Sequence, residues 1–209
     1  RMPDRHPSDQ LAPSLPDRDS AQRAHAPATL VGLLEQWRSD RPAVIVDHDG
    51  EPDVTTYAWL SDKAVRTAAG LRAAGVGPEE RIAVLAPNSP AWIAAYFGIV
   101  AAGATAVPLD YHSAAADLEG MLSRSGCRRL FTSKAALERL PESWSKGAEA
   151  IYVIDPFEGA ADKVSSWTVL LKDARDTPVP VIEPDAVASL LFTSGTTGTP
   201  KAVPLTHSQ

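Results

Sequence analysis

The sequence has a single cysteine, Cys127. One cysteine excludes an internal disulfide framework and a CxxC metal site, and such usage is typical of a reducing cytoplasm. No histidine lies near it in the sequence, so we interpret Cys127 as a small, semi-buried hydrophobe rather than a nucleophile. We therefore expect a cytoplasmic protein without a disulfide-stabilised core.

Charged residues are absent between Arg81 and Asp110, a stretch that is long enough to cross a membrane. Prolines interrupt it, and Asn88-Ser89-Pro90 is typical of a helix N-cap followed by proline at the first helical position. A buried strand, a buried helix and a second strand explain the stretch better than a transmembrane segment. The sequence also lacks the apolar region of a secretory signal.

Basic residues are not in excess, because 20 lysines and arginines face 26 acidic residues, for a formal net charge of −6. This balance predicts no general affinity for nucleic acid or for anionic lipid surfaces. Residues 1–27 combine many charges with prolines and little apolar surface, so we expect a disordered tail there. The remaining residues, 28–209, are numerous and apolar enough to bury a substantial core.

Apolar patterns of strand length alternate with patterns of helix length along residues 28–209. The predicted strands are 82–85, 105–109, 130–131, 151–154 and 187–192, and the predicted helices are 56–75, 90–102, 118–126 and 133–140. This alternation predicts an α/β fold whose mostly parallel sheet is covered by helices on both faces. Residues 156–184 are polar, and we expect them to form a peripheral connection anchored by Trp167 and Leu170-Leu171.

The apolar run Val187 to Phe192 leads directly into Thr193-Ser194-Gly195-Thr196-Thr197-Gly198-Thr199-Pro200-Lys201. Gly195 and Gly198 permit positive φ and let backbone amides approach a bulky anion. Lys201 adds a mobile cation, which suits a polyphosphate. Further uncharged donors come from the hydroxyls of Thr193, Ser194, Thr196 and Thr197. The pattern predicts a phosphate-binding loop.

A Walker-type loop is the nearest alternative, but it requires glycine directly before the lysine and a helix that begins there. Here Thr199-Pro200 precedes Lys201, and Pro204 disfavours helical angles at Val203. We therefore expect Lys201 to Leu205 to be extended, so that the phosphate meets a loop between two strands. An ordinary P-loop NTPase is disfavoured for the same reason.

Residues 193–201 resemble the phosphate-loop signature of the adenylate-forming superfamily, which includes acyl-CoA synthetases, adenylation domains of nonribosomal peptide synthetases and beetle luciferases. Earlier segments resemble the family's landmarks in their usual order: Thr56-Tyr57 before a helix, Arg81 to Pro90, and Gly98 to Asp110. The resemblance covers about Thr29 to Gln209 and implies the amino-terminal portion of the large adenylation domain. Ala202 departs from it, because the family usually has glycine there.

In this family a carboxylate attacks the α-phosphate of MgATP, which releases pyrophosphate and leaves an acyl-adenylate for transfer to a thiol. The resemblance therefore implies ATP and Mg²⁺ as cofactors, a carboxylic acid as substrate, and coenzyme A or another thiol as acceptor. It implies Lys201 as the catalytic cation that stabilises the departing pyrophosphate. It also implies that the phosphate ligands are Thr193, Ser194, Thr196 and Thr197, with Gly195 and Gly198 shaping the backbone.

The family places adenine and ribose recognition, a magnesium-binding carboxylate, the acyl pocket and a second catalytic lysine downstream of this loop. None of these segments is in the sequence. Thr206 and Gln209 have the spacing of a Thr-x-x-Gln capping box, which predicts a helix that begins there. We therefore expect a domain truncated after the phosphate-binding loop, which does not complete catalysis alone.

Three hypotheses about function stay open at this point. The sequences of Val107 to Asp110 and of Lys201 to His207 resemble fatty acyl-CoA synthetases slightly more than they resemble amino-acid adenylation domains of peptide synthetases. A non-catalytic nucleotide-binding module is the third hypothesis. A downstream lysine and a magnesium carboxylate in the full-length sequence favour an enzyme, and their loss favours the module.

None of the five histidines has the spacing of metal ligands, so we expect structural or solvated roles for His6, His25, His48, His112 and His207. His207 follows the loop and is expected at the first position of the helix predicted above. Asp47 and Asp49 flank His48 near Gly50, which favours a hairpin turn over a metal site.

Overall fold

The computed structural model describes residues 28–49, 51–159, 162–172, 180–193 and 200–209. The tail that the sequence predicts at residues 1–27 lies outside the described residues. The elements are, in chain order, α2 (Leu30–Gln36), β1 (Pro42–His48), β2 (Glu51–Thr56), α3 (Tyr57–Ala73), β3 (Arg81–Leu85), α4 (Pro90–Ala101), β4 (Thr105–Pro108), α5 (Ala115–Ser125), β5 (Arg129–Thr132), α6 (Lys134–Leu137), α7 (Glu142–Gly147), β6 (Ala150–Val153), β7 (Val164–Ser166), the 3₁₀ helix η2 (Trp167–Leu171), β8 (Val187–Thr193) and β9 (Lys201–Thr206).

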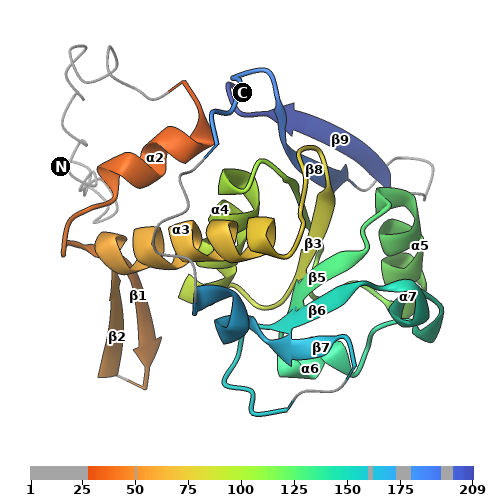
Figure 1. Cartoon of the computed structure of the whole chain (residues 1–209). Coiled ribbons are helices and arrows are strands. Elements are labelled where there is room, and N and C mark those ends of the chain that lie inside the picture. The colour runs from red at the N-terminus through yellow and green to blue at the C-terminus, as the bar shows by residue number, and fades with distance from the viewer. Residues whose placement is uncertain (1–27, 50, 160–161, 173–179, 194–199) are drawn as a thin grey trace, which may run out of the picture.

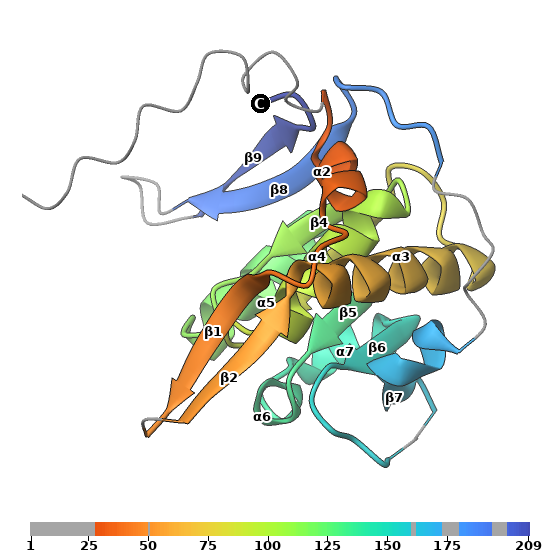
Figure 2. The ribbon, with the colours of Figure 1, turned by 90° about the vertical axis from the view of Figure 1, so that its left-hand side faces the viewer.

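A seven-stranded sheet forms the centre of the structure, in the order β7-β6-β5-β3-β4-β8-β9 (Figure 1). All neighbouring strands are parallel except β8 and β9, which form an antiparallel pair at one edge. A separate antiparallel hairpin, β1–β2, extends away from this sheet next to the start of α3 (Figure 2). The mostly parallel α/β architecture predicted from the sequence is confirmed.

Each face of the sheet has its own apolar core, because successive side chains of a buried strand point in opposite directions. Ile82 and Val84 of β3 belong to the core under α2, α3, α4 and η2. Ala83 and Leu85 of the same strand belong to the core under α5 and α6. We call the first the α4 face and the second the α5 face, and these names are used below.

The helix boundaries follow the capping residues of the sequence. Thr56 and Ser89 cap α3 and α4, since their hydroxyls accept hydrogen bonds from the backbone N–H groups of Trp59 and Trp92. The helix α5 ends at Gly126, whose φ of 70° is left-handed and therefore favours glycine. These predicted boundaries are confirmed to within a few residues.

The prediction that residues 156–184 form only a peripheral connection is partly wrong. Val164–Ser166 form β7, an edge strand parallel to β6, and a 3₁₀ helix follows. The three-residue strand is too short for a recognisable alternating pattern, which is why the sequence did not indicate it. The predicted anchors are confirmed, because Trp167, Leu170 and Leu171 are buried against the α4-face core.

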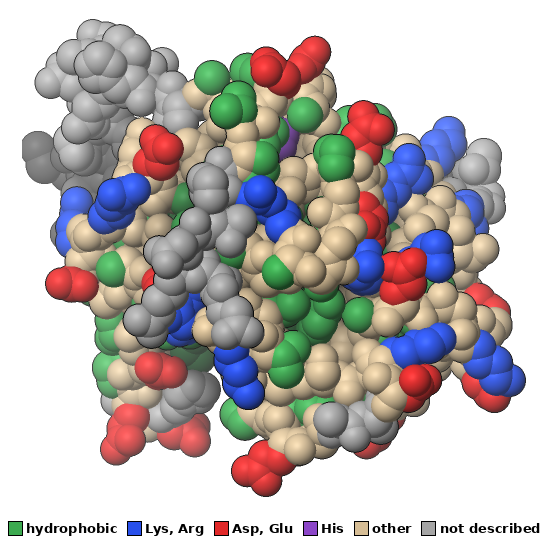
Figure 3. All heavy atoms as spheres, in the orientation of Figure 1, with side chains coloured by type: hydrophobic (Ala, Val, Ile, Leu, Met, Phe, Trp, Pro, Cys, Tyr) green, Lys and Arg blue, Asp and Glu red, His purple; other side chains and the backbone are tan. Residues whose placement is uncertain are grey.

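The structure also describes the predicted hairpin turn near Asp49 and the uncharged stretch between Arg81 and Asp110. The turn around Asp49 joins β1 to β2, and Asp49 has a left-handed φ of 55°. No helix within the described residues is long and apolar enough to cross a membrane, and the uncharged stretch is divided among β3, α4 and β4 as predicted. Basic and acidic side chains are interspersed over the face of the molecule in Figure 3.

Candidate functional site

The predicted phosphate-binding loop joins β8 to β9 in an antiparallel hairpin. Thr193, the last residue of β8, is in register with Lys201, the first residue of β9, and both are exposed. Directly opposed residues of an antiparallel pair project on the same face with their Cβ atoms about 5 Å apart. The hairpin therefore places one predicted hydroxyl ligand beside the predicted catalytic cation.

The middle of the loop lies outside the described residues. The roles of five residues there therefore stay predictions: Ser194, Gly195, Thr196, Thr197 and Gly198. The strands on either side are described. Residues 201–206 are extended, as the proline at position 204 predicts, and no helix follows the lysine. The Walker-type alternative is thereby excluded for this loop.

A β-bulge sets the direction of the side chains that lead into the loop. The register of β8 against β9 shifts between Val187 and Ser189, so β8 has one extra residue, Ala188. After the bulge, Ser189 faces α4 and Leu190 packs in the α5-face core. Strict alternation from Ser189 then places Thr193 on the α4 face.

Several contacts hold β8 in place next to the rest of the sheet. The Thr105 hydroxyl of β4 donates a hydrogen bond of 3.1 Å to the carbonyl of Val187. On the α5 face, the Arg124 guanidinium of α5 lies 5.9 Å from the ring centroid of Phe192, the residue before Thr193. These contacts help to fix the strand that carries the loop.

Tyr96 and Ser189 are residues that the sequence analysis missed. Their hydroxyls share a hydrogen bond between α4 and β8, and Ser189 is 3% exposed. A signal was present, because Ser189 is the one polar residue in the apolar run 187–192. A hydroxyl in a buried strand needs a partner, which the sequence does not name because α4 is far away along the chain.

The loop lies at the carboxyl-terminal edge of the parallel strands, where ligands bind in open α/β sheets. The segment after β4 shares this edge, and Arg139 braces it by donating hydrogen bonds of 2.8 Å to the carbonyls of Tyr111 and Ser113. Asp110 accepts a hydrogen bond from the backbone N–H of His112. Among the described residues, no group of His, Cys, Asp and Glu has the arrangement of a metal site.

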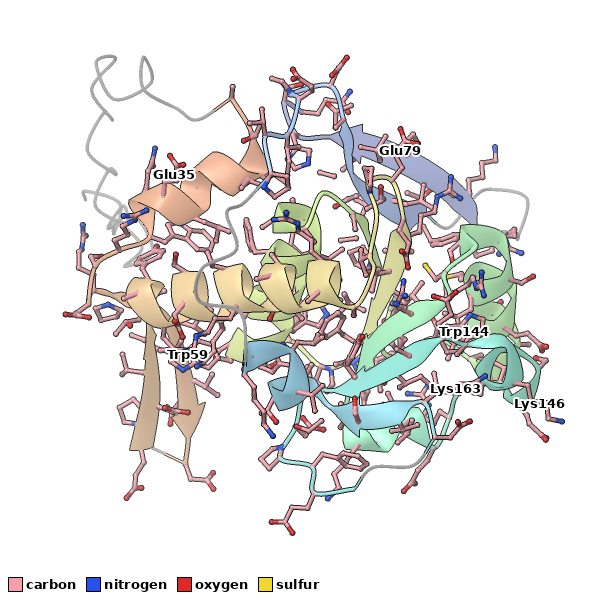
Figure 4. All side chains as sticks on the ribbon, viewed as in Figure 1. Glu35, Trp59, Glu79, Trp144, Lys146 and Lys163 are labelled. Carbon is pink, nitrogen blue, oxygen red and sulfur yellow. The ribbon has the colours of Figure 1, made fainter. Side chains whose placement is uncertain are left out.

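A cavity of about 640 Å³ lies at the amino-terminal ends of the parallel strands, opposite to the ends that carry the loop. Its walls include Arg81, Thr105 and Val187, which are the first residues of β3, β4 and β8, together with Glu79 (Figure 4). First residues of parallel strands mark the amino-terminal edge, whereas the loop follows the last residue of β8. The cavity therefore lies away from the predicted phosphate-binding loop.

The lone cysteine is buried, and its burial raises its pKa to about 11. The Trp144 indole donates to the carbonyl of Cys127 at 2.9 Å, so Cys127 lies under α7 (Figure 4). A thiol with so high a pKa is protonated at neutral pH and is a poor nucleophile. The structural role predicted for Cys127 is consistent with this position, although the residue is fully rather than partly buried.

His207 is 6% exposed, and its Nδ1 has no hydrogen-bond partner among the described residues. Burial lowers its pKa below the ordinary value of 6.5 because the charged form loses its hydration. Its backbone N–H donates to the carbonyl of Ala186. One half of the predicted capping box is present, since the Gln209 side chain accepts from the Thr206 backbone N–H at 3.0 Å. Residues 207–208 form a turn.

The chain belongs to the AMP-binding enzyme family, which matches it over residues 34–209. It is 36% identical over 176 residues to a feruloyl-CoA synthase of Amycolatopsis sp, an alignment that covers 83% of this chain and 32% of that protein. It is 34% identical over 182 residues to the phosphinothricin tripeptide synthetase PhsC of Streptomyces viridochromogenes, covering 86% of this chain and 15% of that one.

The fold is similar to that of the anthranilate CoA ligase AuaEII, whose crystal structure contains anthranoyl-AMP. The TM-score is 0.73 at 26% identity, over 88% of this chain and 36% of the ligase. The chain thus spans about a third or less of the length of these relatives. These findings support the resemblance given under Sequence analysis at the level of family and fold.

Proposed function

We propose that this chain is the part of an ATP-dependent acid–thiol ligase that binds the phosphates of ATP. The observation that carries the proposal is the β8–β9 hairpin, which sets Thr193 beside Lys201 at the carboxyl-terminal edge of the sheet. The family match and the ligase relatives support the same chemistry. In the proposed reaction a carboxylate attacks the α-phosphate, pyrophosphate leaves, and the acyl-adenylate passes to a thiol.

The role of the hairpin follows from where charge develops in this reaction. Negative charge increases on the pyrophosphate oxygens as the bond to the α-phosphate breaks. Fixed donors and a cation therefore stabilise the transition state more than they stabilise bound ATP. Lys201 is the proposed catalytic cation, and Thr193 is the proposed phosphate ligand that the structure describes. The proposed ligands at 194–198 complete the set.

The substrate of the proposed ligase is a carboxylic acid, and coenzyme A is the proposed thiol. A fatty acid is our first choice from the sequence, and an aromatic acid is supported by the feruloyl-CoA synthase and by the anthranilate CoA ligase. The similarity to PhsC supports an amino-acid adenylation domain as the second candidate. Mg²⁺ accompanies ATP in the proposal, without ligands assigned to it here.

The experiment is a thioester assay on the full-length gene product with ATP, coenzyme A and a panel of fatty, aryl and amino acids. An acyl-CoA product for one acid class, identified by mass spectrometry, supports the ligase and names its substrate. An amino acyl-adenylate that does not pass to coenzyme A supports the second candidate. Absence of adenylate with every acid favours a non-catalytic module. We propose that the 209-residue chain assayed alone forms no adenylate.

A further inference from the structure

The hydrogen bond between Tyr96 and Ser189 joins a half-buried aromatic side chain to a buried hydroxyl. The Tyr96 ring is stacked on Trp92, with centroids 5.6 Å apart and planes 6° apart, and it meets Phe97 edge-on at 5.4 Å. These neighbours leave the ring little freedom. The hydroxyl is therefore held at one place over β8, where it meets the buried Ser189 hydroxyl at 2.5 Å.

The parallel neighbour β4 gives β8 little guidance at this position. Among the described residues, β4 and β8 are in register at a single pair, Ala106 and Ser189. By contrast, β3 and β4 remain in register from Arg81 to Val84. The rest of the pairing of β8 is with the edge strand β9, so side-chain contacts help to decide how β8 and β9 are placed along the central sheet. Tyr96 contacts it at the very residue where the single pair occurs.

The bulge at Ala188 makes this placement consequential for the loop. A shift of one residue in a strand moves every following side chain to the opposite face of the sheet. If the bulge were lost while Val187 stayed paired with Thr206, Ser189 and Thr193 would turn from the α4 face to the α5 face, and Thr193 would no longer oppose Lys201. The Tyr96 hydroxyl can bond Ser189 only when Ser189 faces α4, so the bond selects one of these two arrangements.

We propose that Tyr96 is a positioning residue for the phosphate-binding hairpin: its bond to Ser189 holds β8 in the register that puts Thr193 and Lys201 on the α4 face. The expected effect of Tyr96 on catalysis rests on the proposed function of the hairpin. Its expected effect on the register of β8 does not. Tyr96 itself does not touch the nucleotide in this account, because Ser189 lies four residues, roughly 13 Å, before Thr193 along the strand.

The test compares Tyr96→Phe with wild type in carboxylate-dependent exchange of labelled pyrophosphate into ATP, using the full-length gene product. The variant keeps the ring and its stacking but loses the hydroxyl. We expect KM for ATP to rise roughly threefold to tenfold, the range that loss of one buried hydrogen bond produces, while kcat changes less. Tyr152→Phe is the control, because it removes the hydroxyl of a buried tyrosine that lies on β6, away from β8.

Ser189→Ala tests the same bond from its other side. Because both substitutions remove one interaction, Ser189→Ala added to Tyr96→Phe should not raise KM further. A Tyr96→Phe variant with unchanged KM, or a double variant whose effects multiply, would overturn the proposal. A fall in kcat alone, equal in Tyr96→Phe and Tyr152→Phe, would also overturn it, since that result indicates general loss of packing.

Hydrogen exchange of residues 187–206 separates this inference from the proposed function. Measured on the 209-residue chain, amide exchange in β8 and β9 should become faster in Tyr96→Phe and stay at the wild-type rate in Tyr152→Phe. Wild-type protein without pyrophosphate exchange would refute the proposed function and leave this measurement valid. Unchanged amide exchange in Tyr96→Phe would refute the positioning role whatever the activity.

Discussion

His207 shows how a single residue can tie the stability of the fold to pH. Its side chain is buried, its Nδ1 has no partner among the described residues, and its pKa is lowered by desolvation. The unfolded chain therefore binds a proton more readily than the folded chain as the pH falls through about 6.5. The contribution of neutral His207 to stability is fully present above the ordinary pKa of 6.5 and is lost as the pH falls from there toward the lowered pKa of the folded state.

We predict that wild-type protein loses more thermal stability than His207→Phe when the pH is lowered from about 7.5 to about 5.5. The reason is that phenylalanine fills the buried site without a proton to gain. The measurement is the midpoint of thermal unfolding at the two pH values, with His112→Phe as the exposed-histidine control. An equal loss in wild type and His207→Phe would contradict the assignment.

Residues with a strong local signal were the ones that sequence analysis placed well. The caps Thr56 and Ser89 and the stop at Gly126 depend on neighbours three or four positions away, and all three were predicted. Tyr96 and Ser189 depend on each other across 93 positions of sequence, so no local pattern pairs them. Within the site, the sequence therefore predicted the loop and its lysine, but not the contact that orients the strand.

At the scale of elements, the packing of α3 on α4 depends on a close approach between the two helices. A Cβ built on Gly98 of α4 would lie 2.5 Å from the Cβ of Thr67 on α3. Thr67 has little freedom to move, because it is fully buried and accepts a 2.8 Å hydrogen bond from the indole of Trp167. The glycine is thus needed for space in the middle of a helix.

We predict that Gly98→Ala lowers the free energy of unfolding by about 1–3 kcal/mol, the usual cost of overpacking a core. Gly120→Ala is the matched control, since Gly120 also lies in a helix but would meet only the end of the flexible Arg124 side chain. There we expect a gain of up to about 1 kcal/mol from helix propensity. Urea unfolding measures both, and a neutral Gly98→Ala would contradict the packing account.

The elements also show where a pattern in sequence is sufficient and where it is not. The central strands β3, β4, β5, β6 and β8 are apolar runs of four to seven residues, and the helix α3 is long enough for its period to be read, so these elements were predicted. The edge strand β7 has three residues and its place comes from pairing with β6, so it was missed. The bulge at Ala188 was missed as well, because it exists only relative to β9.

At the scale of the whole molecule, the arrangement of the sheet separates two regions that the sequence alone does not distinguish. The loop follows the carboxyl end of β8, and the cavity beside Glu79 and Arg81 lies at the amino-terminal edge. The proposed chemistry belongs to the first region. The parallel order of the central strands brings the ends of β3, β4 and β8 together at that edge, which is why the hairpin emerges beside the segment that Arg139 braces.

The central claim is that Lys201 stabilises charge on departing pyrophosphate, and one measurement tests it most directly. In carboxylate-dependent pyrophosphate exchange by the full-length gene product, Lys201→Ala should reduce the rate roughly tenfold to a thousandfold, as loss of a preorganised anion contact does elsewhere. Lys146→Ala is the control, because Lys146 lies on α7, away from the hairpin, and is 74% exposed (Figure 4). A Lys201→Ala variant that exchanges pyrophosphate at the wild-type rate would contradict the account.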